Sequence, residues 1–137
     1  FLGAVDQLAG NLSEFASIHG ETDNDFFGAD VSGIGDVNGD SYGDIIVSAS
    51  GAGTIGTVYV FYGPLEGTID LGSGEMAAGK INGSNLSSGL NSNFGARLSV
   101  DDMDGDGVHD IIAASALHDS ASGTDIGSVF LFTTVFD

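Results

Sequence analysis

Residues 36–46 read DVNGDSYGDII, and residues 102–112 read DMDGDGVHDII. Both segments place oxygen-bearing side chains at positions 1, 3, 5 and 9 of a glycine-containing turn, and both continue into an apolar stretch. Alternate residues of such a turn can direct their oxygens at one point. That arrangement suits calcium, a hard cation that takes six to eight oxygen ligands at about 2.3–2.6 Å. The two segments therefore predict two Ca²⁺ sites.

The spacing identifies the candidate ligands. In the first loop they are Asp36, Asn38, Asp40, Asp44 and the backbone carbonyl of Tyr42; in the second they are Asp102, Asp104, Asp106, Asp110 and the backbone carbonyl of Val108. Carboxylates about 4 Å apart repel one another by roughly 1 to 4 kcal/mol between bulk water and a protein surface. Each cluster therefore needs a cation, and we expect the metal to be part of the fold. The second loop carries more charge, which predicts that it binds calcium more tightly.

Two other interpretations of the loops compete with the metal sites. An EF-hand requires a bidentate Glu at position 12, where this chain has Val47 and Ala113, and it requires flanking helices, so it is rejected. Solvated acidic turns stay open as an alternative, because Asp, Asn and Gly are ordinary turn residues. Repetition at matched spacing favours the metal sites.

The repetition extends well beyond the loops, as expected of two copies of one structural unit. Five segments recur in the same order. The first copy has Ile18-His19-Gly20, Phe27-Gly28-Ala29, the first loop, residues 44–50 and residues 56–61. The second copy has Ile81-Asn82-Gly83, Phe94-Gly95-Ala96, the second loop, residues 110–116 and residues 127–132. The offset grows from 63 residues at Ile18 to 71 residues at Gly56, which indicates small loop insertions.

These segments resemble the FG-GAP repeat, the blade unit of the integrin alpha-subunit propeller. The resemblance rests on an Ile-x-Gly lead-in, Phe-Gly, the DxDxDxxxD-type loop, an Asp-Ile-Ile strand and a closing Gly-x-Val-Tyr-Val-Phe-Tyr-Gly strand, and it covers nearly the whole chain. It implies an all-β fold of two FG-GAP β-propeller-type blades, built from short antiparallel strands. Two features depart from the family pattern. Residues 48–50 and 114–116 replace Gly-Ala-Pro, and the first copy has one extra residue between Phe27-Gly28 and Asp36.

The repeat comparison predicts three segments. Residues 1–4 align with residues 61–64 and are expected to end a strand of a preceding repeat, residues 5–64 form the first FG-GAP repeat, and residues 65–137 form the second. Two blades leave open sheet edges, which are liable to pair with other chains. We therefore expect either part of a longer propeller array or a homo-oligomer that completes itself from its own copies.

Composition restricts the partners. The chain has 20 Asp and Glu against Lys80 and Arg97, for a formal net charge of -18. Nucleic acid is excluded, because phosphate binding needs clustered Lys and Arg. Anionic membrane surfaces are excluded for the same reason, and no segment suggests membrane insertion. The chain has no cysteine, so it has neither a disulfide framework nor a thiolate zinc site.

Calcium loops of this kind favour an extracellular or cell-surface location, because weak sites fill only where calcium is near-millimolar. Three N-glycosylation sequons, at Asn11, Asn82 and Asn85, agree with that location and predict a glycoprotein.

Two enzyme-like motifs do not fit their surroundings. Residues 39–43 match the G-x-S-x-G nucleophile elbow, and residues 51–56 match G-x-G-x-x-G. Both motifs require a following helix, whereas strands are predicted after both segments. We predict no catalytic residues and no organic cofactor. The aromatic residues are expected to pack in blade cores rather than to form a ligand platform; they include Phe26, Phe27, Phe94, Phe130 and Phe132.

The sequence thus predicts an extracellular calcium-binding module that acts in adhesion, protein–protein interaction or self-assembly, with a protein or extracellular-matrix ligand. The alternative is a non-catalytic propeller domain of an extracellular hydrolase or lyase.

Overall fold

The computed structural model describes residues 15–53, 55–86, 92–117 and 126–133. Its strands are β1 (Ala16–His19), β2 (Phe27–Gly35), β3 (Asp44–Ala49), β4 (Thr57–Phe61), β5 (Gly67–Asp70), β6 (Gly79–Asn82), β7 (Phe94–Asp101), β8 (Asp110–Ser115) and β9 (Ser128–Phe132). The helical elements in these ranges are two single 3₁₀ turns, η1 (Leu71–Ser73) and η2 (Gly83–Asn85). The predicted all-β class is confirmed. The predicted strand end at residues 1–4 and the sequon at Asn11 lie outside the described residues.

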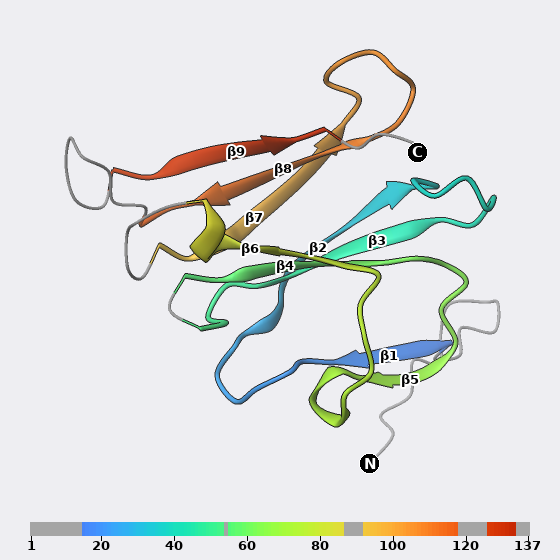
Figure 1. Ribbon diagram of the computed structural model, residues 1–137, viewed down its shortest axis with the longest axis horizontal. Helices are drawn as coiled ribbons and strands as arrows, with labels where there is room; N and C mark the ends of the chain where they lie inside the picture. Colours follow the sequence, from blue (N-terminus) through green and yellow to red (C-terminus); the bar gives the residue numbers. More distant parts are fainter. Residues whose placement is uncertain (1–14, 54, 87–91, 118–125, 134–137) are drawn as a thin grey trace, which may run out of the picture.

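The strands form three layers (Figure 1). The middle layer is an antiparallel sheet in the order β2-β3-β4-β6, and an antiparallel sheet in the order β7-β8-β9 packs on one side of it. The pair β1-β5 packs on the other side. This last pair is parallel, which the sequence did not predict.

The two large sheets have the same internal arrangement. In both, the Asp-Ile-Ile segment forms the central strand, β3 or β8, and the strand that precedes the acidic loop pairs with it antiparallel. The extra residue of the first copy lies in a β-bulge, because Gly33 pairs with Ile45 and Gly35 with Asp44. Ile34, the residue between them, is only 1% exposed. The insertion therefore adds a core side chain without disturbing the acidic loop.

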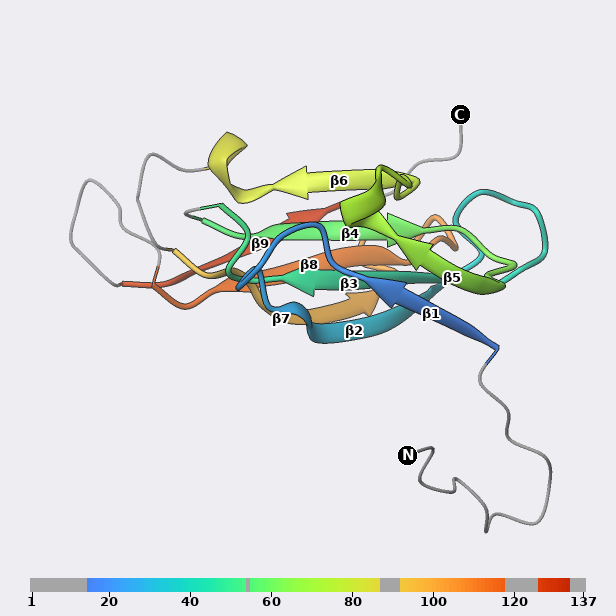
Figure 2. The ribbon, with the colours of Figure 1, turned by 90° about the horizontal axis from the view of Figure 1, so that it is seen from below.

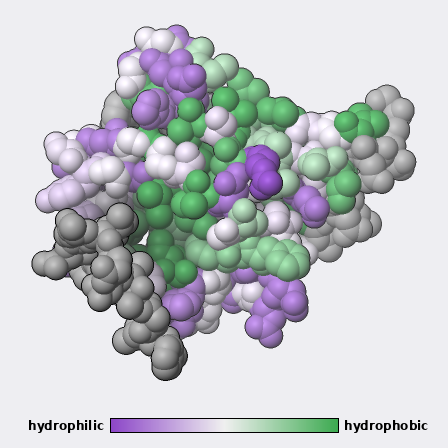
Figure 3. Space-filling model, turned by 180° about the vertical axis from the view of Figure 1, so that it is seen from behind, coloured by the Kyte–Doolittle hydropathy of each residue, from purple (hydrophilic) through white to green (hydrophobic). Residues whose placement is uncertain are grey.

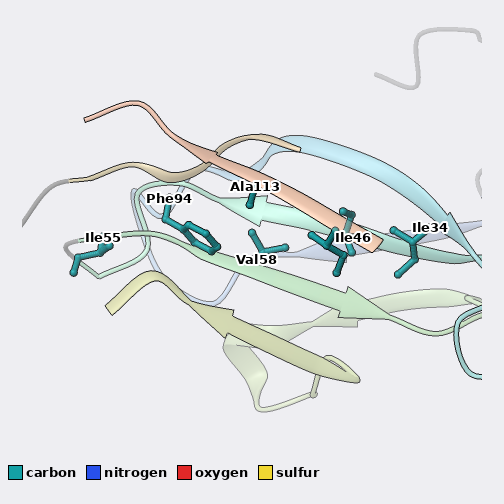
Figure 4. Close-up of a cluster of buried hydrophobic side chains, with 7 residues drawn as sticks. Ile34, Ile46, Ile55, Val58, Phe94 and Ala113 are labelled. Carbon is teal, nitrogen blue, oxygen red and sulfur yellow. The ribbon is translucent and has the colours of Figure 1, made fainter. Parts of the chain in front are cut away.

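One hydrophobic core lies between the two large sheets (Figure 4). Ile46 and Val58 of the middle sheet, both 0% exposed, meet Phe94 and Ala113 of the second sheet. The rings of Phe130 and Phe132 pack edge-on against Phe94. These residues carry the contact between the repeats, because burial of apolar area is the main favourable term in folding.

A second core lies between the middle sheet and the β1-β5 pair. Its buried members are Val47, Ala49, Tyr59, Phe61 and Leu71, and Ile18 and Ile69 of the outer pair pack against them. Phe27 contacts the rings of Tyr59 and Phe61 edge-on.

The prediction that Phe26 belongs to the core is wrong. Phe26 is 66% exposed and has a backbone φ of 54°, which places it in the left-handed region. Phe26 therefore lies in the turn before β2 and stays at the surface, whereas Phe27, the first residue of the strand, packs against the second core.

Asp30 links the two large sheets through polar contacts. One of its carboxylate oxygens accepts a hydrogen bond from the backbone N–H of Leu98 in β7 (2.7 Å), and the other accepts from Val31 (3.0 Å). Its own N–H donates to the hydroxyl of Ser48 (2.9 Å). The carboxylate thereby satisfies the backbone N–H of Leu98, which follows the bulge of β7 between Phe94 and Arg97.

The half-exposed carboxylate of Glu21 lies between Lys80 and Tyr59. It accepts a hydrogen bond from the Tyr59 hydroxyl (3.0 Å) and forms an ion pair with Lys80, whose ammonium also lies 4.9 Å from the centre of the Tyr59 ring. The hydrogen bond from Lys80, followed by that from Tyr59, lowers the pKa of Glu21. Burial, followed by the hydrogen bond to Glu21, raises the pKa of Tyr59.

This arrangement predicts a pH effect on stability. A carboxyl group whose pKa is lowered by folding stabilises the protein above its unfolded pKa, and that stabilisation is lost as the pH falls through its folded pKa. The difference in the free energy of unfolding between the wild type and Glu21→Gln should therefore fall as the pH is lowered from about 6 to about 3. The expected fall is about 0.5 kcal/mol, the size typical of a solvent-exposed ion pair. Urea denaturation at each pH measures it. The fall should shrink in a Lys80→Gln background, and an unchanged fall would contradict the assignment to Lys80.

Candidate metal centre

The two acidic loops occupy equivalent places in the fold. The first connects β2 to β3 and the second connects β7 to β8, and both emerge at the same end of the stacked sheets (Figure 1). The sheets therefore hold the two loops side by side at one end of the molecule. The sequence predicts the loops individually, but their shared location depends on the packing of the two repeats.

The second loop brings three predicted ligands together. Asp102, Asp104 and Asp106 each offer a carboxylate oxygen, and these oxygens lie within 4.8 Å of one another. Among the described residues, this is the only group of three or more His, Cys, Asp or Glu side chains with ligand atoms so close. Asp104 and Asp106 are exposed and Asp102 is half-buried, so the cluster is open to solvent on one side.

The same hydrogen bonds shape both loops. Position 1 accepts from the N–H groups at positions 4 and 6: Asp36 from Gly39 (2.7 Å) and Ser41 (2.7 Å), and Asp102 from Gly105 (2.7 Å) and Gly107 (3.0 Å). The side chain at position 3 accepts from the N–H at position 5: Asn38 from Asp40, and Asp104 from Asp106. The side chain at position 5 accepts from the N–H at position 7: Asp40 from Tyr42, and Asp106 from Val108. The backbone thus winds around its own side-chain oxygens.

Position 9 differs from the other predicted ligands. Asp44 and Asp110 are each 1% exposed and lie at the start of the central strands. Asp44 accepts from the N–H groups of Val37 (2.8 Å) and Gly63 (2.9 Å), and Asp110 accepts from Met103 (2.8 Å). Asp110 is not a member of the three-carboxylate cluster. Both residues therefore tie the loop to the sheet, whether or not they also reach a cation.

The first loop is less concentrated in charge. The amide of Asn38 donates a hydrogen bond to the carboxylate of Asp40 (2.9 Å), so one ligand position is neutral and already paired with another. The side chain of Tyr42 is 53% exposed, whereas Val108 at the same position of the second loop is 5% exposed. The carbonyl groups of these two residues stay predicted ligands.

The donor set of both loops fits calcium. The side chains that the structure gathers offer only oxygen, and mainly carboxylate oxygen, which is the ligand type that Ca²⁺ prefers. Asp102, Asp104 and Asp106 would hold the ion in the second loop, and Asp36, Asn38 and Asp40 would hold it in the first. Position 9 and the carbonyl at position 7 would complete each site.

Ser41 provides a test of the loop backbone. It has a φ of 74°, in the left-handed region that costs an L-residue roughly 1 kcal/mol, whereas Gly107 occupies the same position of the second loop with a φ of 89°. Ser41→Gly is therefore expected to stabilise the protein by about 1 kcal/mol. Gly107→Ala should destabilise it by a similar amount, because alanine is strained at this φ. Nothing lies within 4 Å of the added Cβ, so no steric clash adds to that cost. Urea denaturation of both variants in calcium measures the effects, and the same sign for both would contradict the prediction.

One contact near the loops was missed by sequence reasoning. His109, an exposed residue at position 8 of the second loop, places its Nδ1 atom 3.2 Å from the carbonyl oxygen of Ile34. His109 thereby connects the second loop to the bulge of β2. The inserted residue was visible in the sequence, but nothing there indicated that a residue 75 positions away would contact it.

The enzyme-like motifs have the surroundings that the sequence predicts. Ser41 lies inside the first loop, and strand β3 follows it. Residues 51–56 lead into strand β4. Neither segment precedes a helix, so neither forms the strand–turn–helix geometry that a nucleophile elbow or a phosphate loop needs. Of the sequons, Asn82 lies in β6, where its side-chain oxygen accepts a hydrogen bond from Thr57 (3.1 Å), and Asn85 lies in η2.

No helix in the described part of the chain has the length and apolar character needed to cross a membrane.

Comparisons with known proteins agree with the repeat architecture. The FG-GAP repeat model matches residues 27–61, which run from the start of β2 through the first loop to the end of β4. The chain is 28% identical over 134 residues to a phosphatidylinositol-glycan-specific phospholipase D of Dictyostelium discoideum, with 88% of this chain aligned. It is 40% identical over 88 residues to integrin alpha pat-2 of Caenorhabditis elegans, with 62% of this chain aligned.

The aligned segments span only 14% of the phospholipase D and 7% of the integrin chain. The likeness therefore concerns a repeat unit rather than either whole protein. Residues 27–61 carry the FG-GAP loop and strands, and the second sheet repeats their arrangement. Residues 27–61 therefore match the FG-GAP repeat, and the similarity to an integrin alpha chain supports that family assignment for this part of the sequence.

Proposed function

We propose that this chain is an extracellular module that binds two calcium ions and presents a rigid surface for protein–protein contact. The observation that carries the proposal is the pair of loops with matching hydrogen bonds, held at the same end of the stacked sheets. Calcium in each loop would neutralise the clustered carboxylates and fix the turn between two core strands. The ions would thus order the end of the molecule rather than take part in a reaction.

The surface beside the first loop has features of a contact site. A pocket of about 440 Å³ is lined by Phe15, Tyr42, Gly43, Pro64, Leu65 and Glu66. Phe15 and Tyr42 are 66% and 53% exposed. Hydrophobic residues also reach the surface among hydrophilic ones on the face opposite to the view of Figure 1 (Figure 3). Exposed aromatic residues near an ordered loop are suited to a protein or extracellular-matrix ligand.

A solid-phase binding assay tests this proposal. Immobilised chain is incubated with purified collagen, fibronectin and laminin, in millimolar calcium and in chelator. Calcium-dependent retention of at least one of them is expected, with loss of retention in Tyr42→Ala but not in Met76→Ala, whose side chain is 87% exposed and lies outside the pocket. Retention that is equal in calcium and chelator would contradict a role for the metal loops.

A second candidate is an accessory domain of a larger extracellular hydrolase or lyase. The similarity to a phospholipase D over 88% of this chain favours it. On that proposal the chain itself has no catalytic part, and it should release no product from glycosylphosphatidylinositol-anchored substrate. Activity of the purified chain would overturn the non-catalytic assignment under both candidates.

A further inference from the structure

A hydrogen bond joins the second acidic loop to the strand that leads into the first. Strands β2 and β7 lie side by side, and the loops that follow them leave the sheets at the same end (Figure 2). There the ring of His109 places its Nδ1 atom 3.2 Å from the carbonyl oxygen of Ile34, which lies in the bulge of β2. A carbonyl oxygen only accepts hydrogen bonds, so Nδ1–H is the donor. The contact is therefore directional.

The second loop holds His109 from both sides. Its preceding neighbour is Val108, whose carbonyl is a predicted ligand and whose N–H donates to the carboxylate of Asp106 (2.8 Å). Its following neighbour is Asp110, which is 1% exposed and accepts a hydrogen bond from the N–H of Met103 (2.8 Å). Filling this loop with a cation would fix the backbone at positions 7 and 9, and it would thereby restrict the positions open to the His109 ring.

The other end of the contact lies next to the residue that organises the first loop. Gly35 follows Ile34 and precedes Asp36, which is position 1 of that loop. The carboxylate of Asp36 accepts hydrogen bonds from the N–H groups of Gly39 (2.7 Å) and Ser41 (2.7 Å). A displacement of the backbone at Ile34 or Gly35 would therefore move the side chain around which the first loop is folded.

The ring of His109 also fits closely against Gly35. This glycine has a φ of 74°, and a Cβ built on it would lie 3.1 Å from Nδ1 and 3.6 Å from Cε1 of His109. The ring thus occupies the space beside the glycine backbone. Because Ile34 is only 1% exposed, the peptide that His109 contacts is also held by the core. This part of β2 cannot shift far without moving the ring.

The contact depends on a difference between the two copies. The carbonyl acceptor belongs to the bulge of the first copy, whereas β7 pairs with β8 in regular register at the corresponding end, with Val100 opposite Ile111 and Asp101 opposite Asp110. Position 8 is His109 in the second loop but Gly43 in the first. Donor and acceptor therefore occur in different copies, and the inserted residue of the first copy has a role besides packing.

We propose that His109 is a positioning residue for the first calcium loop, so that filling the second loop raises the affinity of the first. This role rests on the proposed calcium binding, and it names the residue that couples the two sites. His109 acts through Ile34 and Gly35 on Asp36 and is not itself a ligand. Two filled loops would also repel each other, which acts with the opposite sign, but physiological salt screens such repulsion beyond about 8 Å.

Terbium luminescence measures binding at the first loop. Tb³⁺ is a hard cation that takes oxygen ligands as Ca²⁺ does, and its emission is sensitised by a nearby tyrosine. Tyr42 lies in the first loop, whereas the second loop contains no tyrosine or tryptophan. The chain is titrated with Tb³⁺ in physiological salt, and Tyr42→Phe, which should lose most of the signal, confirms which loop is observed.

His109→Ala should weaken Tb³⁺ binding at the first loop by roughly two- to tenfold, the range that one net hydrogen bond can supply. His109→Asn should recover most of the affinity, because its amide N–H can lie where histidine carries Nδ1. The matched control is His19→Ala, which removes an exposed histidine outside the loops and should leave the affinity unchanged. Binding by His109→Ala as tight as that of the wild type would overturn the proposal.

Repeating the measurement without the second site separates coupling from a general loss of structure. In Asp102→Ala/Asp106→Ala the first loop should bind Tb³⁺ more weakly than in the wild type, and adding His109→Ala should then change little. Circular dichroism shows that each variant is folded. An equal loss from His109→Ala with and without the second site would overturn the coupling while leaving the proposed calcium binding intact. Absence of Tb³⁺ and Ca²⁺ binding in the wild type would overturn both.

Discussion

Millimolar calcium is expected to raise the melting temperature of this protein by about 10 °C or more relative to a chelated sample. A ligand at about 100 times its Kd stabilises the folded state by about 2.7 kcal/mol for each site, and two sites add. In a domain of this size, each kcal/mol shifts the melting temperature by roughly 2 to 8 °C. The physical cause is the removal of repulsion among the loop carboxylates, which the structure gathers within 4.8 Å in the second loop.

The variant Asp102→Ala/Asp106→Ala isolates the contribution of the second loop. It should lose about half of the calcium-induced shift, because one of the two predicted sites is removed. The matched control, Asp23→Ala/Glu66→Ala, removes the same number of charges from exposed positions outside the loops and should keep the full shift. Coincident melting curves for wild type and Asp102→Ala/Asp106→Ala, with and without calcium, would contradict a structural metal.

Asp44→Ala is expected to lower the free energy of unfolding by about 3 kcal/mol, in chelator as well as in calcium. The side chain is 1% exposed and accepts hydrogen bonds from the N–H groups of Val37 and Gly63. Its removal leaves two donors without their acceptor, at a cost of about 1 to 3 kcal/mol for each that stays buried. Urea denaturation measures the effect.

Asp40→Ala is the comparison for this variant, because Asp40 is an exposed carboxylate of the same loop. It should be destabilising in calcium, where a ligand is lost, and close to neutral in chelator. The two variants thus separate the role of position 9 in fixing the loop to the sheet from the role of position 5 in binding the ion. If Asp44→Ala had no effect in chelator, the structural role assigned to position 9 would be wrong.

The parts of the fold that the sequence predicts are those set by local spacing. The loops, the Asp-Ile-Ile strands and the repeat order follow from residues close together in the chain, where turn chemistry and short apolar runs act directly. The first loop and the strands around it lie within the segment that the FG-GAP model matches. Phe27 and Phe94 enter the cores for the same reason, since each begins the strand before its loop.

The contacts that escaped prediction join residues far apart in the sequence. Asp30 accepts a hydrogen bond from Leu98, 68 positions away, and β1 pairs in parallel with β5 across the whole first repeat. The spacing of neighbouring residues in the sequence does not indicate either contact. The role of Asp44 was only partly predicted: its position in the loop indicated a ligand, but its burial against Val37 and Gly63 depends on where the sheet places the loop.

Calcium titration by isothermal calorimetry tests the central claim most directly. The wild type should bind two ions per chain, with the tighter site assigned to the second loop. Asp102→Ala/Asp106→Ala should bind one ion with the weaker affinity, and Asp23→Ala/Glu66→Ala should still bind two. No measurable binding by the wild type at millimolar calcium, or unchanged binding after the second loop is neutralised, would contradict the account.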